Sequence, residues 1–205
     1  MLQEENVERL KIKKQNLDNL FFTADLHFGH ANIIKYTKRP WKTVGEMDAA
    51  LVANWNARIG HGDLVVVAGD FVMDSRRVCE YVEQLQGEII YVLGDHGVVL
   101  PGKKGSECFR SVHHTLHLSM PDDYPDIIVN HWAMRRWPKM HHGSWHLFGH
   151  SHGTMEPYGR SFDCGVDSFK EIYAPISYWA VRAFMLGLED GEEMRLMDRA
   201  LSNSD

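Results

Sequence analysis

The feature that most constrains the fold is a set of short, strongly apolar runs along the chain. Residues 64–68 (LVVVA) and 88–93 (EIIYVL) have the composition of strands that are buried on both faces. Before the first run, Met47, Leu51, Trp55 and Ile59 recur at four-residue spacing, which predicts a helix that buries one face. Because helices alternate with buried strands, we expect an α/β fold.

The remaining elements follow from the same patterns. Further strands are expected at residues 21–24, 112–118, 126–129 and 145–148. Further helices are expected from Asp74 or Ser75 to Gly87, from Ser177 to about Met185, and over 191–201. No linker or repeat divides the chain, which predicts a single domain over residues 1–205, with 1–19 as a peripheral N-terminal arm and C-terminal helices in 176–205.

The charge, the lengths of the apolar runs and the cysteines argue against several classes of protein. The 22 Lys and Arg against 28 Asp and Glu give a formal net charge of −6, which argues against a protein that coats long nucleic acid. No apolar run approaches the ~20 residues of a membrane span, and the charged first twenty residues do not resemble a signal peptide. Cys79, Cys108 and Cys164 are odd in number and far apart, so we expect neither a disulfide framework nor a thiolate zinc site. Together these features favour a cytoplasmic protein.

Asp or His follows five of the expected strands. A single Asp after a strand is usually a turn former or helix cap. Five such junctions, which mix Asp with His, instead indicate one site at the carboxyl ends of the strands, where α/β sheets bind ligands. Gly before several of them permits close approach of the chain to a bound ion. The junctions are Asp25-Leu-His27, Gly69-Asp70, Gly94-Asp95-His96, Asn130-His131 and Gly149-His150-Ser-His152.

Carboxylates and imidazoles together are suited to Mn, Fe, Ni or Zn rather than to an all-oxygen Ca or Mg cage. The candidates outnumber the ligands of one four-coordinate ion, and they suit two ions that share a carboxylate. Two divalent cations would also remove the repulsion among the carboxylates. Such a pair activates water at neutral pH and clamps the oxygens of a phosphoryl group. The natural use of this set is therefore hydrolysis of a phosphate ester.

The order of these motifs resembles that of the calcineurin-like metallophosphoesterases. Their pattern is D-x-H, GD, GNH(D/E), H and GHxH, and the resemblance spans about residues 21–167. The contexts TADLHFGHANII, GSWHLFGHSHG and DCGVD are similar to those of a small bacterial and phage branch of the superfamily. The resemblance implies a four-layer αββα sandwich of two mixed β-sheets flanked by helices.

The resemblance also implies a role for each residue. Asp25, His27 and His152 would hold one metal ion, and His131 and His150 the other, with Asp70 as the bridge and Asp95 completing the second site. A hydroxide held by the two ions would attack phosphorus, with His96 as the general acid. The expected ions are Mn²⁺, with Fe, Ni or Zn as alternatives. Asp163 and Asp167 are expected to be turn and support residues rather than ligands.

The third motif departs from the family pattern. Asp95 stands where the family has Asn, and Gly97 stands where it has an acidic residue. Asp95 can coordinate but adds a negative charge, which weakens the attraction for an anionic ester. Gly97 lacks the carboxylate that orients the general acid in the family. Both changes predict a slower enzyme.

The leading interpretation is a phosphodiesterase that acts on a small or nucleotide-like phosphoester, with His30 and Arg135 as substrate-binding residues. The loop between His131 and His150, which carries Arg135, is expected to overhang the site. One alternative is a phosphomonoesterase or protein phosphatase. Another is a degenerate, low-activity family member that acts as a binding module.

Overall fold

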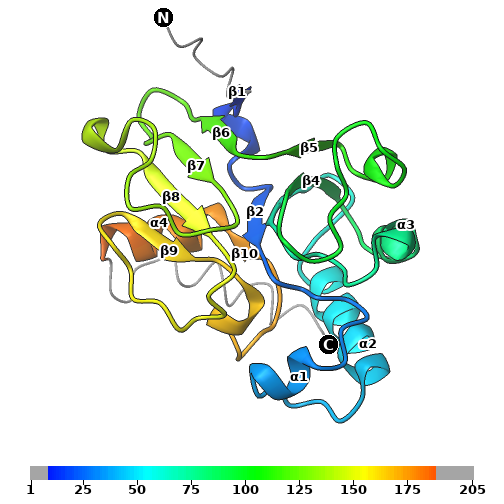
Figure 1. Cartoon of the computed structure of the whole chain (residues 1–205). Helices are drawn as coiled ribbons and strands as arrows, with labels where there is room; N and C mark the ends of the chain where they lie inside the picture. The colour runs from blue at the N-terminus through cyan, green and yellow to red at the C-terminus, as the bar shows by residue number, and fades with distance from the viewer. Residues whose placement is uncertain (1–8, 188–205) are drawn as a thin grey trace, which may run out of the picture.

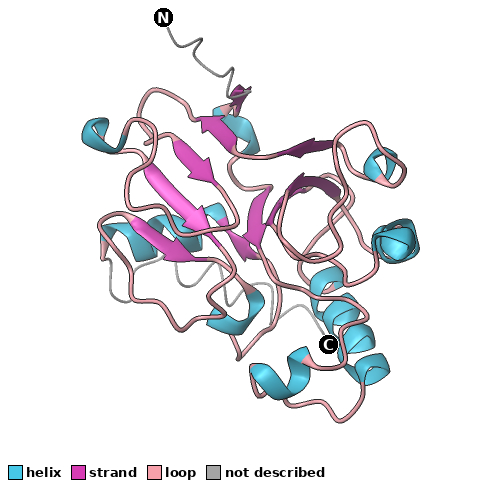
Figure 2. Ribbon diagram, viewed as in Figure 1, coloured by secondary structure: helices cyan, strands magenta, loops and turns pink. Residues whose placement is uncertain are grey.

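The chain folds into two five-stranded sheets, which the computed structural model describes over residues 9–187 (Figures 1 and 2). The first sheet has the order β10 (Ile176–Ser177), β2 (Leu20–Thr23), β3 (Leu64–Ala68), β4 (Glu88–Val92) and β5 (Ser111–His113). The second sheet has the order β1 (Arg9–Lys11), β6 (Leu116–Ser119), β7 (Ile127–Val129), β8 (Trp145–Phe148) and β9 (Ser161–Asp163).

Both sheets are mixed. In the first, β2 through β5 run parallel and only β10 is antiparallel to its neighbour. In the second, only the β6–β7 pair is antiparallel. The carboxyl ends of β2, β3 and β4 therefore lie at the same end of the first sheet. Those of β7 and β8 likewise lie at the same end of the second sheet. The expected α/β fold with two mixed sheets is confirmed.

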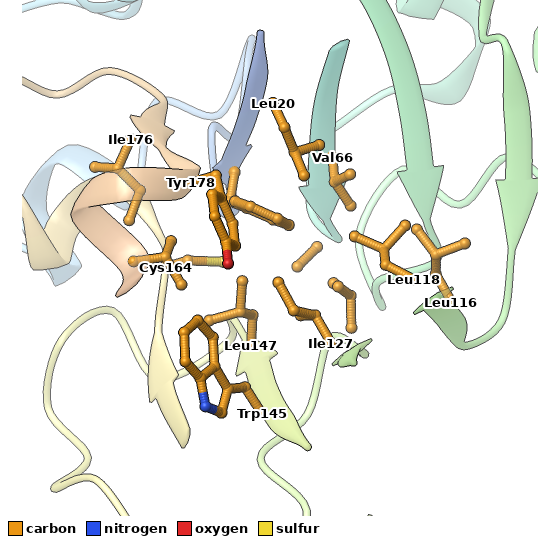
Figure 3. Close-up of a cluster of buried hydrophobic side chains, with 14 of the residues drawn as sticks. Leu20, Val66, Leu116, Leu118, Ile127, Trp145, Leu147, Cys164, Ile176 and Tyr178 are labelled. Carbon is orange, nitrogen blue, oxygen red and sulfur yellow. The ribbon is translucent and has the colours of Figure 1, made fainter. Parts of the chain in front are cut away.

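The main core lies between the two sheets (Figure 3). Val66 and Ile90 of the first sheet pack there with Leu116 and Trp145 of the second, and all four are buried. Their sequence neighbours on the first sheet face the opposite way, because side chains alternate along a strand. These neighbours form a second core against the helices on the outer face of the sheet. Because β3 and β4 are buried on both faces, their sequences are continuous apolar runs.

Four α-helices are described: α1 (Ile33–Tyr36), α2 (Val44–Asn56), α3 (Val78–Val82) and α4 (Tyr178–Leu186). A capping box of Thr43 and Glu46 begins α2, and the stripe residues Met47, Leu51 and Trp55 are fully buried. Ile59, the last residue of the expected stripe, is also buried but lies beyond the end of the helix at Asn56. Ser177 caps α4 through the amide of Ala180, as predicted. The 3₁₀ segments are η1 (Lys14–Asn16), η2 (Ser75–Arg77), η3 (Ser106–Cys108), η4 (Met140–His142) and η5 (Val166–Ser168).

The structure shortens the helix that was expected before Gly87. Asp74 does cap it, but the first turn is the 3₁₀ segment η2 and only α3 is α-helical. The expected helix over 191–201 lies outside the described residues. Within residues 9–187, no helix has the length and apolar character needed to cross a bilayer.

The N-terminal arm is not peripheral where it is described. β1 pairs in parallel with β6, with Leu10 opposite Leu118, and so forms an edge of the second sheet. Ile12 and Leu17 follow β1 and are buried in the core between the sheets. The sequence pattern did not predict this short strand. An edge strand buries only part of its surface, so charged residues can occupy its exposed positions.

The single strand expected over 112–118 is two strands in different sheets. β5 ends at His113 in the first sheet, and β6 begins at Leu116 in the second. The alternation of apolar and polar residues in the sequence continues across the crossing, although the chain bends at His114 and Thr115 between the two strands. Local periodicity therefore does not reveal which sheet each half joins.

The expectation that the chain has no disulfide is wrong for one pair. Cys79 of α3 and Cys108 of η3 are bonded, with their Cα atoms 5.6 Å apart. The loop that follows β4 returns across α3 and brings together two cysteines separated by 29 positions, which spacing alone does not reveal. Cys164 is free and buried.

Candidate metal centre

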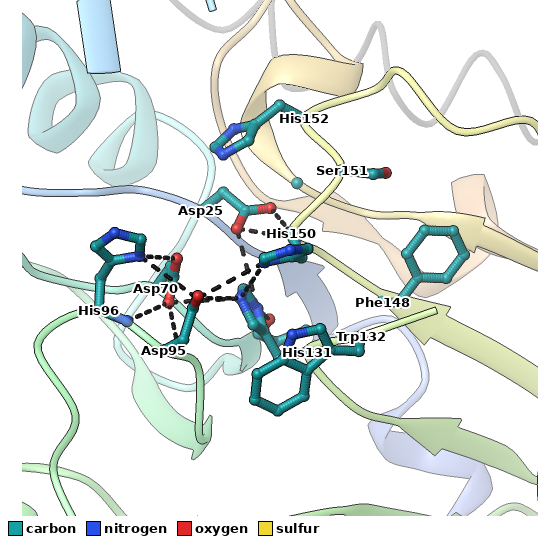
Figure 4. Close-up of polar contacts among 12 residues, drawn as sticks. Asp25, Asp70, Asp95, His96, His131, Trp132, Phe148, His150, Ser151 and His152 are labelled. Atoms are coloured by element: carbon teal, nitrogen blue, oxygen red, sulfur yellow. Dashed lines mark hydrogen bonds and ion pairs between the residues drawn. The ribbon is translucent and has the colours of Figure 1, made fainter. Parts of the chain in front are cut away.

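All seven predicted ligands converge where the carboxyl ends of the two sheets meet. Figure 4 labels Asp25, Asp70, Asp95, His131, His150 and His152 among them. They form two groups in which the ligand atoms lie within 4.8 Å of one another. We call Asp25, His27 and His152 the inner group, and Asp95, His131 and His150 the outer group. Asp70 lies between them, because its carboxylate is within the same distance of His27 and Asp25 of the inner group and of His131 of the outer group.

The backbone at these positions is unusual. Five of the seven predicted ligands have positive φ angles: Asp25 58°, His27 54°, Asp70 49°, His150 67° and His152 49°. A left-handed conformation costs a residue with a side chain about 1–3 kcal/mol, and such strain concentrates at functional sites. Each bend turns a side chain back across the end of its strand, toward the ligands from other strands.

The glycines before the ligands make room for neighbouring side chains. A Cβ atom at Gly69 would overlap the ring of His131, and one at Gly94 would overlap the Asp70 carboxylate. At Gly149 a Cβ atom would lie 2.7 Å from Asp25 Oδ2. From the sequence, we expected these glycines to let the backbone approach a bound ion. In the structure, the space beside each glycine is instead filled by a predicted ligand from another strand.

Asp25 of the inner group is fully buried, and desolvation raises its pKa well above the usual value. The neighbouring carboxylates of Asp163, Asp70 and Asp167 add to this rise. The backbone amide of His150 opposes it by donating to both Asp25 oxygens, at 3.0 and 2.9 Å. Because several carboxylates are buried together with few cations, the donor set fits a bound metal ion.

His27 has the properties of a neutral metal ligand. Burial, followed by the charges of His152 and Arg39, lowers the pKa of His27 to about 2. Its Nε2 atom is buried, lies 3.5 Å from Asp70 Oδ2 and has no hydrogen-bond partner among residues 9–187. A buried polar atom without a partner requires an explanation, and a bound metal ion would provide it.

A buried ion pair supports the inner group. His152 Nδ1 lies 2.8 Å from Asp167 Oδ2, and Arg39 donates to both Asp167 oxygens at 3.0 and 2.8 Å. Arg39 also donates to the backbone carbonyls of Asp25, at 2.6 Å, and Leu26, at 2.9 Å. A carboxylate that orients a ligating histidine in this way stabilises a metal site.

The support role predicted for Asp167 agrees with these contacts. Burial opposes ionisation, but hydrogen bonds with His152 and Arg39 lower the pKa of Asp167 to about 2. Asp163 likewise accepts from the Ser151 hydroxyl, at 2.6 Å. Arg39 was missed, because a lone arginine 14 positions after Asp25 has no distinguishing spacing.

The outer group is more open. Asp95 Oδ1 lies 3.1 Å from His131 Nε2 and 3.6 Å from His150 Nδ1, and these two ring nitrogens are 3.3 Å apart. His131 Nδ1 is 2.8 Å from the carbonyl oxygen of Ala68, so Nδ1 carries the proton and Nε2 faces the centre unprotonated. The side chains of Asp95 and His150 are 42% and 47% exposed, whereas that of His131 is fully buried.

His96 faces the same centre. Its Nδ1 lies 2.9 Å from Asp70 Oδ2, and the backbone amides of Asp95 and His96 donate to Asp70 Oδ1 at 2.9 and 3.0 Å. Partial burial lowers the pKa of His96, but the hydrogen bond and charge of Asp70 outweigh burial, and the net pKa is raised. The imidazole is 39% exposed, so it can reach a substrate oxygen.

Gly97 has a steric reason to be glycine. Its φ angle is 55°, and a Cβ atom there would overlap the carbonyl oxygen of Val72. The backbone path after β4 therefore leaves no room for an acidic side chain at this position.

A cavity of about 670 Å³ lies against the predicted ligands. His30 lines it, and its Nδ1 is 3.4 Å from His27 Nδ1. Arg135 does not line this cavity; its guanidinium lies over the ring of Tyr158, 4.5 Å from the centroid. The lining residues are His27, His30, Ile33, Tyr36, Thr37, Lys38, His96, His150, Ser151, His152, Thr154 and Lys170.

The loop after His131 does reach the outer group through one residue. The indole of Trp132 lies 5.1 Å from the ring of His131 and 6.2 Å from that of His150, centroid to centroid. Some histidines on the sheets have structural partners instead. His117 Nε2, for example, lies 2.9 Å from Asp126 Oδ2.

Comparisons with known proteins identify similar chains without assigned activities. No protein-family model matches this sequence. It is 28% identical over 172 residues to the uncharacterized protein MJ1445 of Methanocaldococcus jannaschii, which covers 79% of this chain and 88% of that protein. It is 21% identical over 184 residues to the Gene 66 protein of Mycobacterium phage L5, covering 75% of this chain and 88% of that protein.

One solved structure shares the fold. The crystal structure of AQ665 from Aquifex aeolicus, a protein of unknown function, superposes with a TM-score of 0.60 and 19% sequence identity. The match covers 80% of this chain and 98% of that one. The α/β arrangement is therefore also found in a solved structure, and any function has to be argued from the site itself.

Proposed function

We propose that this protein is a metal-dependent phosphoesterase that hydrolyses phosphodiesters with two divalent ions, Mn²⁺ before Fe, Ni or Zn. The observation that carries this proposal is the pairing of two Asp and His groups around Asp70 beside an open cavity. The motif order and the two-sheet sandwich also support assignment to the calcineurin-like metallophosphoesterases, with their four-layer αββα fold.

The charges of the site suit an anionic ester. Asp25, Asp70 and Asp95 contribute three negative charges, and the histidines would coordinate as neutral ligands. Two divalent cations would leave a formal charge of +1, and zero once the attacking hydroxide is counted, so the cations can still attract the oxygens of a phosphodiester anion. When bound, such ions lower the pKa of water and stabilise charge on the phosphoryl oxygens.

The residues of the chain would then have distinct tasks. The inner group holds its geometry through Asp167 and Arg39, which fix His152. The outer group leaves its ligands open to solvent and hence to substrate. His96 would protonate the leaving oxygen, a contribution of about 10²–10⁴-fold for a positioned general acid.

The test is a comparison of esters and metals. We expect hydrolysis of bis-p-nitrophenyl phosphate in the presence of Mn²⁺, less with Ni²⁺ or Zn²⁺, and none with a chelator. Elemental analysis should find two ions per chain. A preference for p-nitrophenyl phosphate would instead support a phosphomonoesterase, and two bound ions without hydrolysis of any ester would support a binding module.

A further inference from the structure

One wall of the cavity is built from cations that no described carboxylate neutralises. Lys38 follows α1 and Lys170 follows η5, and both line the cavity beside the predicted ligands. Lys170 Nζ lies 3.5 Å from the carbonyl oxygen of Thr37, so the two distant segments are adjacent. Within residues 9–187, neither lysine forms an ion pair, and the cavity lining contains no Asp or Glu. In a chain of net charge −6, this wall is a local cationic surface.

An exposed aromatic ring completes the wall. Tyr36 is 72% exposed, the highest value among the large hydrophobic residues that the structure describes. It ends α1 and lines the cavity, with its ring at 81° to that of His30 and the centroids 6.4 Å apart. A solvent-facing ring beside two lysines is the combination that binds nucleotides, because bases stack on aromatic rings and lysines bind phosphate.

The scissile phosphate does not account for these lysines. A phosphodiester carries one negative charge, and that charge would be met by the ions held at the inner and outer groups. Lys38 and Lys170 are therefore free to bind a second anionic group of the same substrate. Lys38 also has a φ angle of 56°, a strained conformation of the kind that concentrates at functional sites.

We infer that Tyr36, Lys38 and Lys170 form a recognition site for a nucleotide arm of the substrate, with the base on Tyr36 and a second phosphate between the lysines. This inference rests on the proposed phosphodiesterase function and makes its substrate class specific. The preferred substrate is a nucleotide diester that carries an additional phosphate, rather than a simple diester or a nucleotide with one phosphate.

Three chromogenic diesters test this inference, all measured with Mn²⁺. They are bis-p-nitrophenyl phosphate, the p-nitrophenyl ester of thymidine 5′-phosphate, and the same ester with a 3′-phosphate. We expect kcat/KM to rise in that order. In Lys38→Asn/Lys170→Ala, the preference for the 3′-phosphorylated probe over the second probe should fall about tenfold, mainly through KM. Asn suits position 38 because it tolerates a left-handed backbone.

The aromatic part has its own variants. Tyr36→Ala should lower the preference for both thymidine probes over bis-p-nitrophenyl phosphate about tenfold, whereas Tyr36→Phe should retain it because the stacking surface remains. Lys35→Ala is the matched control, since Lys35 is an exposed lysine of the same helix that does not line the cavity. Equal preferences in the wild type, or an equal loss in the Lys35 control, would overturn the inference.

A binding measurement separates this inference from the proposed function. Calorimetry with thymidine 3′,5′-bisphosphate requires no turnover, and we expect the double lysine variant to bind it about tenfold more weakly than the wild type does. If no diester is hydrolysed but this difference is found, the phosphodiesterase proposal fails and the nucleotide site stands. If simple diesters are hydrolysed and the difference is absent, the nucleotide site fails alone.

Discussion

The inner and outer groups use similar ligands in opposite environments. Asp25 and His27 of the inner group are buried, and Arg39 and Asp167 form a buried ion pair beside them. In the outer group only His131 is buried, and its partners face solvent. Burial raises the pKa of Asp25 far above its usual range, so a buried carboxylate needs a cation to remain ionised.

We expect this difference to separate a site that mainly binds an ion from a site at which the reaction takes place. A buried, supported set of ligands binds an ion firmly because its geometry is fixed before the ion arrives. An exposed set leaves positions for water and substrate, as catalytic metal sites require. We therefore expect the inner group to bind metal more tightly than the outer group, with the chemistry at the outer side. Four single substitutions, one of them with a companion double variant, test this comparison.

The largest effect is expected from Asp70→Asn, which removes the carboxylate shared by both groups. Without this negative charge, both groups should bind Mn²⁺ more weakly, and the difference in affinity between them should disappear. Diester hydrolysis should fall by at least about 10³-fold. Titration calorimetry with Mn²⁺ should show both sites weakened. Two unchanged binding steps would show that Asp70 is not shared.

His96→Asn tests whether the chemistry lies at the open side. With a dinucleotide, whose leaving alkoxide needs a proton, kcat should fall about 10²-fold. With bis-p-nitrophenyl phosphate the loss should be much smaller, because nitrophenolate leaves without protonation. An equal loss with both substrates would contradict a general-acid role. Mn²⁺ content should be measured alongside to confirm that the ions remain bound.

Arg39→Met should weaken the inner group selectively. It leaves the buried Asp167 carboxylate without its arginine partner, so stability to urea should fall by about 3–5 kcal/mol. Mn²⁺ affinity at the tighter site should fall about 10–100-fold while the weaker site is unaffected.

A companion variant separates the two effects of Arg39→Met. Arg39→Met/Asp167→Leu leaves no unpaired buried charge and should recover most of the stability. It should not recover the metal affinity, because His152 has now lost the Asp167 carboxylate that orients it. If affinity returned together with stability, Arg39 and Asp167 would have only a structural role.

The smallest effect is expected from Asp95→Asn in the outer group. Removal of one negative charge should weaken Mn²⁺ binding at the weaker site about tenfold, and leave the tighter site unchanged. At saturating metal, turnover should rise modestly, because more positive charge remains for the anionic ester. A lower turnover at saturating metal would contradict this view of the third motif. Gly97 offers no equivalent test, since a side chain there overlaps Val72.

Much of the fold could be predicted because its signals are local. The LVVVA strand has the predicted bounds, and the four-residue stripe of α2 is buried as expected. The errors arose where distant segments decide the outcome. The β5–β6 crossing continues one alternating pattern across two sheets, and Cys79 meets Cys108 only because a loop returns over α3.

For the candidate site, the sequence by itself determined which side chains follow the strands, because strand runs and the polar residues after them are adjacent in the chain. Only the tertiary structure decided how those ligands divide into a buried and an open group. It also decided that Arg39 supports one of them and that Lys38 and Lys170 line the same wall of the cavity. Burial and pairing depend on contacts between residues more than a hundred positions apart, and such contacts leave no periodic signal in a single sequence.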